Sequence, residues 1–298
     1  MFCQPIEILN LGDYDRESLL FDTINQRKGE SMRIFLMAVK LNLKIFVAYP
    51  KGFLISLLIH PIILFMNIFL FEAIFAYNGT SEIKGYSLSQ MVWYYVVTMF
   101  VYVFIWNFTD RRISNYILSG ELGTLLLRPI SIYRYELANA VALRIAGILF
   151  EFVPGMLIYP WIYPPDFLTP LSLLRFIGVA IMAFLLFFLL NYLIGMTAFV
   201  TQNNSGLNRV VSAAISLLGG VMIPLDFFPG WLRSVCDSLP FKYIFYEPIQ
   251  FFLARGDAAT LEGWLRVVGM QAVWALALYA LGRALWKMLL KHVVVAGG

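Results

Sequence analysis

Six long apolar runs, separated by short polar connections, dominate this chain. They cover roughly residues 53–71, 91–108, 137–159, 176–200, 210–225 and 267–288. Each run is close to the ~20 residues that a helix needs to cross the hydrocarbon core of a bilayer. Lipid offers backbone amides no hydrogen-bond partner, so continuous apolar runs without a strand period must satisfy their amides internally, as helices. The pattern therefore predicts an all-α polytopic membrane protein with six transmembrane helices.

The composition agrees with this prediction, and the placement of the cations orients the helices. Apolar residues make up 60% of the chain and charged residues 13%, against about 25% charged residues in soluble domains. If the N-terminus is cytoplasmic, 16 of the Lys and Arg residues fall on or near that side and 6 on the other. Because cytoplasmic loops are enriched in Lys and Arg, we expect a multi-pass protein with both termini in the cytoplasm.

The region before the first run divides into two parts. Residues 1–31 are polar and acidic, with no apolar core of a signal peptide, and we interpret them as a cytoplasmic tail. Over residues 32–52, four cations fall within about 20° of one line along a helix, at ~100° per residue: Arg33, Lys40, Lys44 and Lys51. This pattern favours an amphipathic helix lying in the membrane interface. The alternative is an extension of the first transmembrane helix.

The predicted cytoplasmic connection between the second and third runs, residues 110–137, contains a short apolar stretch. Leu122–Leu127 is too short to span a membrane. Because proline commonly follows a helix end, we expect a short amphipathic helix that ends at Arg128 and Pro129. Arg128 then either complements the negative C-terminal end of this helix or contacts a partner.

The segment before the last run, residues 226–264, is unusually aromatic for a loop in water. Pro229, Pro240 and Pro248 divide it into pieces too short to span the membrane. Irregular backbone at membrane depth is tolerated only against protein or a cavity. We therefore expect short helices that enter the outer half of the membrane and return.

Sequence motifs for catalysis, cofactor binding or metal binding are absent. There is no phosphate-binding loop, nucleophile elbow, dinucleotide fingerprint or metal-ligand spacing, and the cations form no face for nucleic acid. We therefore predict no catalytic, cofactor or metal residue, and no enzyme by itself. Polar residues inside the spans are the remaining candidates, and those for a translocation path are Asn67, Asn107, Glu151 and Asn191.

These intramembrane residues also have a structural interpretation. An Asn inside a span often hydrogen-bonds to a neighbouring helix, and we favour that role for each of the three. For Glu151, cavity lining and an interhelical hydrogen bond remain equally open. Arg144 lies seven residues earlier in the same predicted helix, and its role is open as well.

Two stretches resemble a known transporter family. Ile117–Leu137, with Ser119-Gly120-Glu121, a Leu-rich centre, Arg128-Pro129 and Tyr133, resembles the first cytoplasmic loop of ABC-2-type exporter permeases, in a poorly characterised bacterial group. Gly219–Phe252, with IPLDFFPGWL and LPF, is similar to the segment before the last helix in that family. The six-helix layout and the amphipathic entry helix match as well, so the resemblance covers about residues 32–290.

The resemblance implies the transmembrane permease subunit of an ATP-binding-cassette exporter in a bacterial plasma (inner) membrane. Two permeases, identical or related, would pair with two ATPase chains that bind the ATP and Mg. The ATPase-coupling residues would be Gly120, Glu121, Leu122, Gly123, Leu125, Leu126, Leu127, Arg128 and Pro129. An outer lid over the exit path would contain Phe227, Phe228, Trp231 and Phe241.

Two other classes of protein compete with this interpretation. A secondary transporter or channel should show inverted repeats or helices broken at the midplane, and we find no convincing repeat. A membrane-embedded lipid-modifying enzyme should cluster His, Asp or Glu near one interface. The sequence does not identify the transported substrate.

Overall fold

The computed structural model describes residues 51–126, 131–201 and 205–289, together with part of residues 32–44. The predicted tail, residues 1–31, lies outside this range. The described chain is almost entirely helical, which confirms the predicted all-α class. A small antiparallel hairpin pairs β1 (Glu82–Ile83) with β2 (Tyr86–Ser87).

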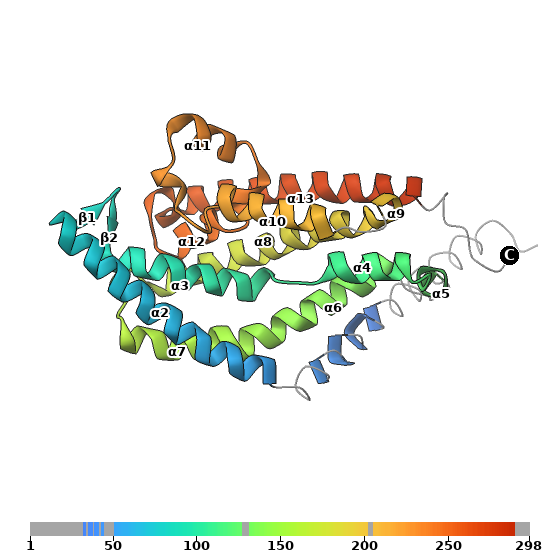
Figure 1. Cartoon of the computed structure of the whole chain (residues 1–298), viewed down its shortest axis with the longest axis horizontal. Helices are drawn as coiled ribbons and strands as arrows, with labels where there is room; N and C mark the ends of the chain where they lie inside the picture. Colours follow the sequence, from blue (N-terminus) through green and yellow to red (C-terminus); the bar gives the residue numbers. More distant parts are fainter. Residues whose placement is uncertain are drawn as a thin grey trace, which may run out of the picture.

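Most of the helices lie side by side along the long axis of the molecule (Figure 1). The longer helical elements are α2 (Lys51–Asn78), α3 (Leu88–Ile105), α4 (Thr109–Leu118), α6 (Ile132–Gly147), α7 (Val153–Ile162), α8 (Pro170–Met196), α10 (Ser205–Leu218) and α13 (Leu261–Leu289). The shorter ones are α5 (Leu122–Leu126), η1 (Ile148–Phe152), α9 (Ala198–Thr201), η2 (Leu225–Phe227), α11 (Gly230–Asp237), η3 (Pro240–Tyr243), α12 (Tyr246–Phe252) and η4 (Gly256–Ala259).

Five helical stretches of the described chain are long and apolar enough to cross a membrane. They are Ile59–Asn78, Leu88–Leu118, Ile132–Ile162, Pro170–Thr201 and Leu261–Leu289. The fifth predicted run, residues 210–225, instead forms α10, which starts earlier and ends at Leu218. Its 14 residues extend about 21 Å at ~1.5 Å per residue, short of a ~30 Å hydrocarbon core.

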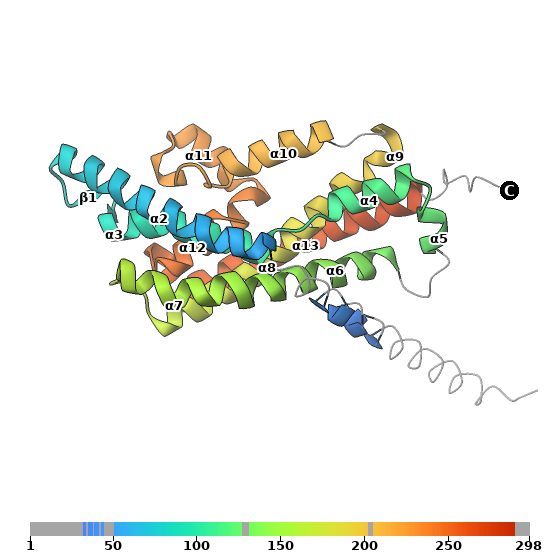
Figure 2. The same ribbon diagram turned by 60° about the horizontal axis from the view of Figure 1, so that its bottom comes forward.

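The two ends of the bundle differ in what they display. One end, called here the α5 end, holds α5, α9 and the end of α13; the opposite end, called the hairpin end, holds the β-hairpin, α12 and the start of α13 (Figures 1 and 2). The α11 helix projects from the side of the bundle toward the hairpin end (Figure 1). The aromatic segment predicted as re-entrant thus folds as short helices: α11 follows Pro229, η3 begins at Pro240, and Pro248 lies in the first turn of α12.

Helix α8 is the centre of the core and contacts α13, α4, α12 and α3. Its inward face buries large aromatic side chains, including Phe176 and Phe188. Gly195 lets α4 approach closely, because a Cβ there would lie 2.8 Å from the Ile113 side chain and 3.0 Å from the Asp110 carbonyl oxygen. Any larger residue at this position would push α4 away from α8.

Two of the membrane-length stretches are interrupted. Extended backbone at Trp106 separates α3 from α4, so the chain is helical again from Thr109 to Leu118, where we had expected a loop. A single π-helical turn, η1, joins α6 to α7. Interruptions of this kind release backbone carbonyls that other groups must satisfy, and they are frequent at functional sites.

The described part of residues 32–44 is helical, as the cation stripe predicts. Its Val39 is buried against Ala138 and Ala142 of α6, with Phe35 and Leu43 packed beside it. On other faces of this helix, three cations and four large apolar side chains are exposed: Arg33, Lys40, Lys44, Met32, Leu36, Met37 and Leu41. A helix that shows cations and apolar residues together suits a membrane interface. Lys51 belongs to α2.

Candidate functional site

The short helix α5 lies at one extreme of the molecule, between α4 and α6 (Figure 2). Gly120 adopts φ +75°, a left-handed conformation that glycine tolerates best, and this turn reverses the chain after α4. The Thr124 hydroxyl donates to the Glu121 carbonyl oxygen, and the Ser119 hydroxyl accepts from the Glu121 amide. The sequence is therefore folded locally to present a single helical turn.

The residues of α5 divide between an inner and an outer face. Leu122 and Leu125 are buried at 3% and 4% exposure against Ile132, with partly buried side chains of α4, α9 and α13 around them. Glu121 and Leu126 are exposed. The two buried leucines hold α5 onto its own chain, and its outer face is exposed. Leu127, Arg128 and Pro129, also predicted as coupling residues, lie outside the described residues.

A buried carboxylate anchors the base of α5. Glu136 of α6 has no solvent exposure, and its Oε2 accepts a 2.6 Å hydrogen bond from Nε of Arg112 in α4. The Tyr116 hydroxyl and the Asn139 amide donate to the other oxygen at 3.0 and 3.4 Å. This cluster, called here the Glu136 cluster, joins the two helices that flank α5. Sequence reasoning missed it, because its members are spread over 28 positions of the chain.

Two of the predicted path residues meet at the interruption between α3 and α4. The Asn191 amide of α8 donates to Oδ1 of Asn107 at 3.2 Å, and the Asn107 amide donates to the Ile105 carbonyl oxygen at 3.0 Å. Both asparagines are buried. Together they satisfy backbone and side-chain groups at the break, which is the interhelical role favoured from the sequence.

Arg144 has a structural role at the same break. Its Nη1 donates to the carbonyl oxygens of Tyr102 and Val103 at 3.2 and 2.6 Å. Both carbonyls lie in the last turn of α3, where helices leave acceptors without intrahelical partners; the Tyr102 oxygen also accepts from the Trp106 amide at 2.9 Å. Arg144 therefore caps α3 from a neighbouring helix.

The remaining two path candidates lie apart from this pair. Asn67 donates to the Ile63 carbonyl oxygen four residues earlier in its own helix. Glu151 lies half-buried in the π-helical turn η1. Among the residues that the structure describes, no hydrogen bond connects either residue to Asn107 or Asn191. A path lined by all four residues thus stays a prediction.

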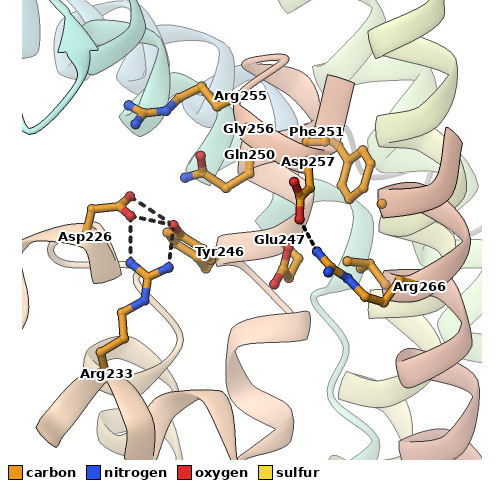
Figure 3. A pocket seen from close by; sticks show the side chains of 13 residues that line it. Asp226, Arg233, Tyr246, Glu247, Gln250, Phe251, Arg255, Gly256, Asp257 and Arg266 are labelled. Atoms are coloured by element: carbon orange, nitrogen blue, oxygen red, sulfur yellow. Dashed lines mark hydrogen bonds and ion pairs between the residues drawn. The ribbon is translucent and has the colours of Figure 1, made fainter. Parts of the chain in front are cut away.

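At the hairpin end, Asp226 is the centre of a second polar cluster. Its carboxylate accepts hydrogen bonds from the hydroxyls of Tyr86 at 2.5 Å and Tyr246 at 2.9 Å, and from Nη1 of Arg233 at 2.6 Å. The Gln250 amide in turn donates to the Tyr86 hydroxyl at 2.8 Å. This Asp226 cluster fastens η2, α11 and α12 to the β-hairpin (Figure 3 shows Asp226, Arg233, Tyr246 and Gln250).

The four predicted lid residues lie on the same segment. Phe227, Phe228 and Phe241 are half-buried, whereas Trp231 is 71% exposed on α11. The fully buried aromatics of the segment are others, Phe245, Phe251 and Phe252. The packing of the segment against the bundle therefore depends on α12 more than on the predicted lid residues.

From the Asp226 cluster we predict that the fold at the hairpin end loses stability in acid. Burial alone would raise the pKa of Asp226, but hydrogen bonds from Tyr86, Arg233 and Tyr246 outweigh burial and lower it below the ordinary 3.8. The ionised carboxylate thus stabilises the fold at every pH above 3.8, and this contribution is lost as the pH falls through the lowered pKa. The protection of the amides of residues 225–253 against exchange, relative to the unfolded chain at the same pH, should fall below about pH 4. Asp226→Asn should already exchange faster at pH 6, and should lack this acid step; the same step in both proteins would contradict the assignment.

The geometry described so far defines a polytopic α-helical membrane protein with polar clusters at both ends of its bundle. Among the described residues, no three His, Cys, Asp or Glu side chains gather as a metal site. The family model described as "ABC-2 family transporter protein" matches residues 61–297, and the chain belongs to this family. No curated protein and no solved structure matches it significantly. The protein is therefore a permease-type component of a membrane transporter.

Proposed function

We propose that this chain is the transmembrane subunit of an exporter driven by a separate ATP-binding-cassette ATPase. The observation that supports this most is α5, a single helical turn at the extreme of the bundle whose inner leucines are packed and whose outer face is free. Leu126 of this helix is 41% exposed, and Leu118 at the end of α4 is 49% exposed nearby in the chain; exposed apolar side chains of this kind suit insertion into a groove on another protein. The ATPase chains would supply the bound ATP and Mg.

We assign the α5 end to the cytoplasm, in a bacterial plasma membrane with both termini inside. Four cations at this end are exposed: Arg111, Arg134, Arg283 and Lys287. At the hairpin end Lys84 and Arg266 are exposed, and Arg233, Lys242 and Arg266 are each paired with an Asp. An excess of exposed cations on one side of the membrane supports this orientation.

A second permease, identical or related, is part of the same proposal. The short helix α10 exposes Leu207, Val210 and Leu217, and its length leaves it unable to span the bilayer by itself. A second permease packed beside α10 would cover these side chains. Asn67 and Glu151 remain candidate path residues, and Phe227, Phe228, Trp231 and Phe241 a candidate lid over the exit.

Purification of the tagged full chain from its native membrane, in a mild detergent, tests the proposal. We expect an ATPase with a phosphate-binding loop to co-purify, and the reconstituted complex to hydrolyse ATP. Substitution of the ATPase's phosphate-loop lysine serves as the control and should abolish hydrolysis. Purification of the chain without any ATPase, together with solute flux that follows an ion gradient instead of ATP, would favour a secondary transporter.

A further inference from the structure

A polar cavity of about 270 Å³ opens at the hairpin end, beside the Asp226 cluster. It lies between α12, the start of α13 and the segment that contains η2 and α11 (Figure 3). Three guanidinium groups and three carboxylates line it: Arg233, Arg255, Arg266, Asp226, Glu247 and Asp257. Small-molecule sites usually occupy ~300–1,000 Å³, so this cavity fits a small molecule or a headgroup.

Two of the three carboxylates form close ion pairs. Asp226 accepts from three donors, as described above, and Asp257 pairs with Arg266. Glu247 differs, because its ion pair is longer: Nζ of Lys242 lies 3.7 Å away and is also shared with Asp237 at 2.8 Å. A carboxylate offers about four acceptor positions, so Glu247 can accept further donors. Burial also raises the pKa of Glu247, even with Lys242 nearby.

Arg255 is the cation of the cavity that has no carboxylate partner among the described residues. Its Nη1 is buried and has no hydrogen-bond partner among the same residues. Its guanidinium carbon lies 3.3 Å from the centre of the Tyr86 ring. The hydroxyl of that ring is fixed by Asp226 at 2.5 Å, so the guanidinium rests on a rigid platform.

The equal numbers of guanidinium and carboxylate groups around the cavity indicate which kind of ligand fits it. An anion alone would meet Glu247 and Asp257 in the same small space, and a cation alone would meet Arg255 and its two neighbouring guanidinium groups. We propose that this cavity binds a small zwitterion, with its ammonium group against Glu247 and its anionic group against Arg255. Phosphoethanolamine has this chemistry, whether as a free solute or as a lipid headgroup.

Isothermal titration of the full-length chain in phosphatidylglycerol nanodiscs tests the proposal, with O-phosphoethanolamine as the probe. We expect saturable binding at one site per chain, tighter than that of ethanolamine or glycerol phosphate, which each have one of the two charges. Glu247→Gln and Arg255→Gln should each weaken binding on the order of 10-fold or more, since each removes a charge-assisted contact.

Glu82→Gln is the matched control. It removes an exposed carboxylate of the β-hairpin that does not line the cavity, so the affinity of this variant should equal that of the unmodified chain. The proposal would be overturned if O-phosphoethanolamine bound no more tightly than ethanolamine or glycerol phosphate. It would also be overturned if the Glu247 and Arg255 variants bound the probe as tightly as the unmodified chain. If Arg255→Gln fails to fold, Arg255→Lys keeps the charge and should retain weakened binding.

A second titration in nanodiscs that contain phosphatidylethanolamine separates the two sources of the ligand. A lipid occupant would compete and weaken binding of the soluble probe, whereas a free zwitterion would bind equally well in both bilayers; either result supports the site. The measurement uses neither ATP nor an ATPase. Its failure would therefore leave the exporter proposal untouched, and failure of the exporter proposal would leave this site in place.

Discussion

Leu126→Asp should disconnect the permease from its ATPase while leaving the permease folded. Leu126 is 41% exposed on the outer face of α5, so a charge there meets water until a partner docks. If Leu126 fills a groove on the ATPase, the association should weaken by ~10-fold or more, the usual loss at a central interface residue. The measurement is the affinity of the purified permease for the ATPase, together with ATP hydrolysis by the reconstituted complex.

The neighbouring leucine gives the contrasting result. Leu125 is 4% exposed, and its replacement by Asp should cost at least the ~2–5 kcal/mol lost when a buried leucine is truncated, which lowers the yield of folded permease. Val235→Asp, an exposed position on α11 at 44% exposure, is the control and should leave ATPase binding unchanged. Wild-type ATPase binding and hydrolysis in Leu126→Asp would exclude α5 as the docking element.

Glu136→Met should strongly destabilise the α5 end. The substitution leaves the Arg112 guanidinium without its carboxylate and removes the acceptor of Tyr116 and Asn139. Loss of one partner of a buried ion pair costs ~3–5 kcal/mol. Because Arg112 is 29% exposed, water compensates part of the loss, and we expect the low end, ~3 kcal/mol. Unfolding by denaturant in detergent measures this loss of stability, with proteolytic cleavage between α4 and α6 as the readout.

The double variant Arg112→Met/Glu136→Met distinguishes a lost ion pair from lost packing. With both charges removed, no uncompensated charge remains, so the double variant should be more stable than Glu136→Met alone. A double variant that is less stable than either single variant would show that the cluster contributes mainly by packing.

The long helices could be predicted from the sequence because lipid imposes one rule on every spanning segment. Apolar length alone therefore located α2, α8 and α13. It failed where local geometry interrupts a helix, since nothing in the pattern marks Trp106 as extended. The sequence also predicted the wrong end for α10. Val221–Leu225 is apolar like the helix before it, but the helix has already ended before Gly220, which has a positive φ.

The candidate site could be predicted only in outline. The run Leu122–Leu127 indicated a docking helix, yet which leucines face inward depends on contacts with Ile132 at the start of α6 and with Phe199 and Trp286, which are distant in sequence. The Asp226 cluster and the polar cavity were not predicted. Their members lie up to 164 positions apart, as Tyr86 and Gln250 do, and only the folded chain brings them together.

The contact of Arg144 with the end of α3 has a consequence for biogenesis. The membrane-length stretch Leu88–Leu118 emerges from the ribosome with one carbonyl, of Val103, whose donor comes from α6; the Tyr102 carbonyl also accepts from the Trp106 amide of the same stretch. A backbone acceptor without a partner in hydrocarbon costs several kcal/mol. This stretch is therefore an incomplete insertion unit. It should remain beside the insertion machinery until α6 arrives, so that the second and third spans enter the bilayer as a pair.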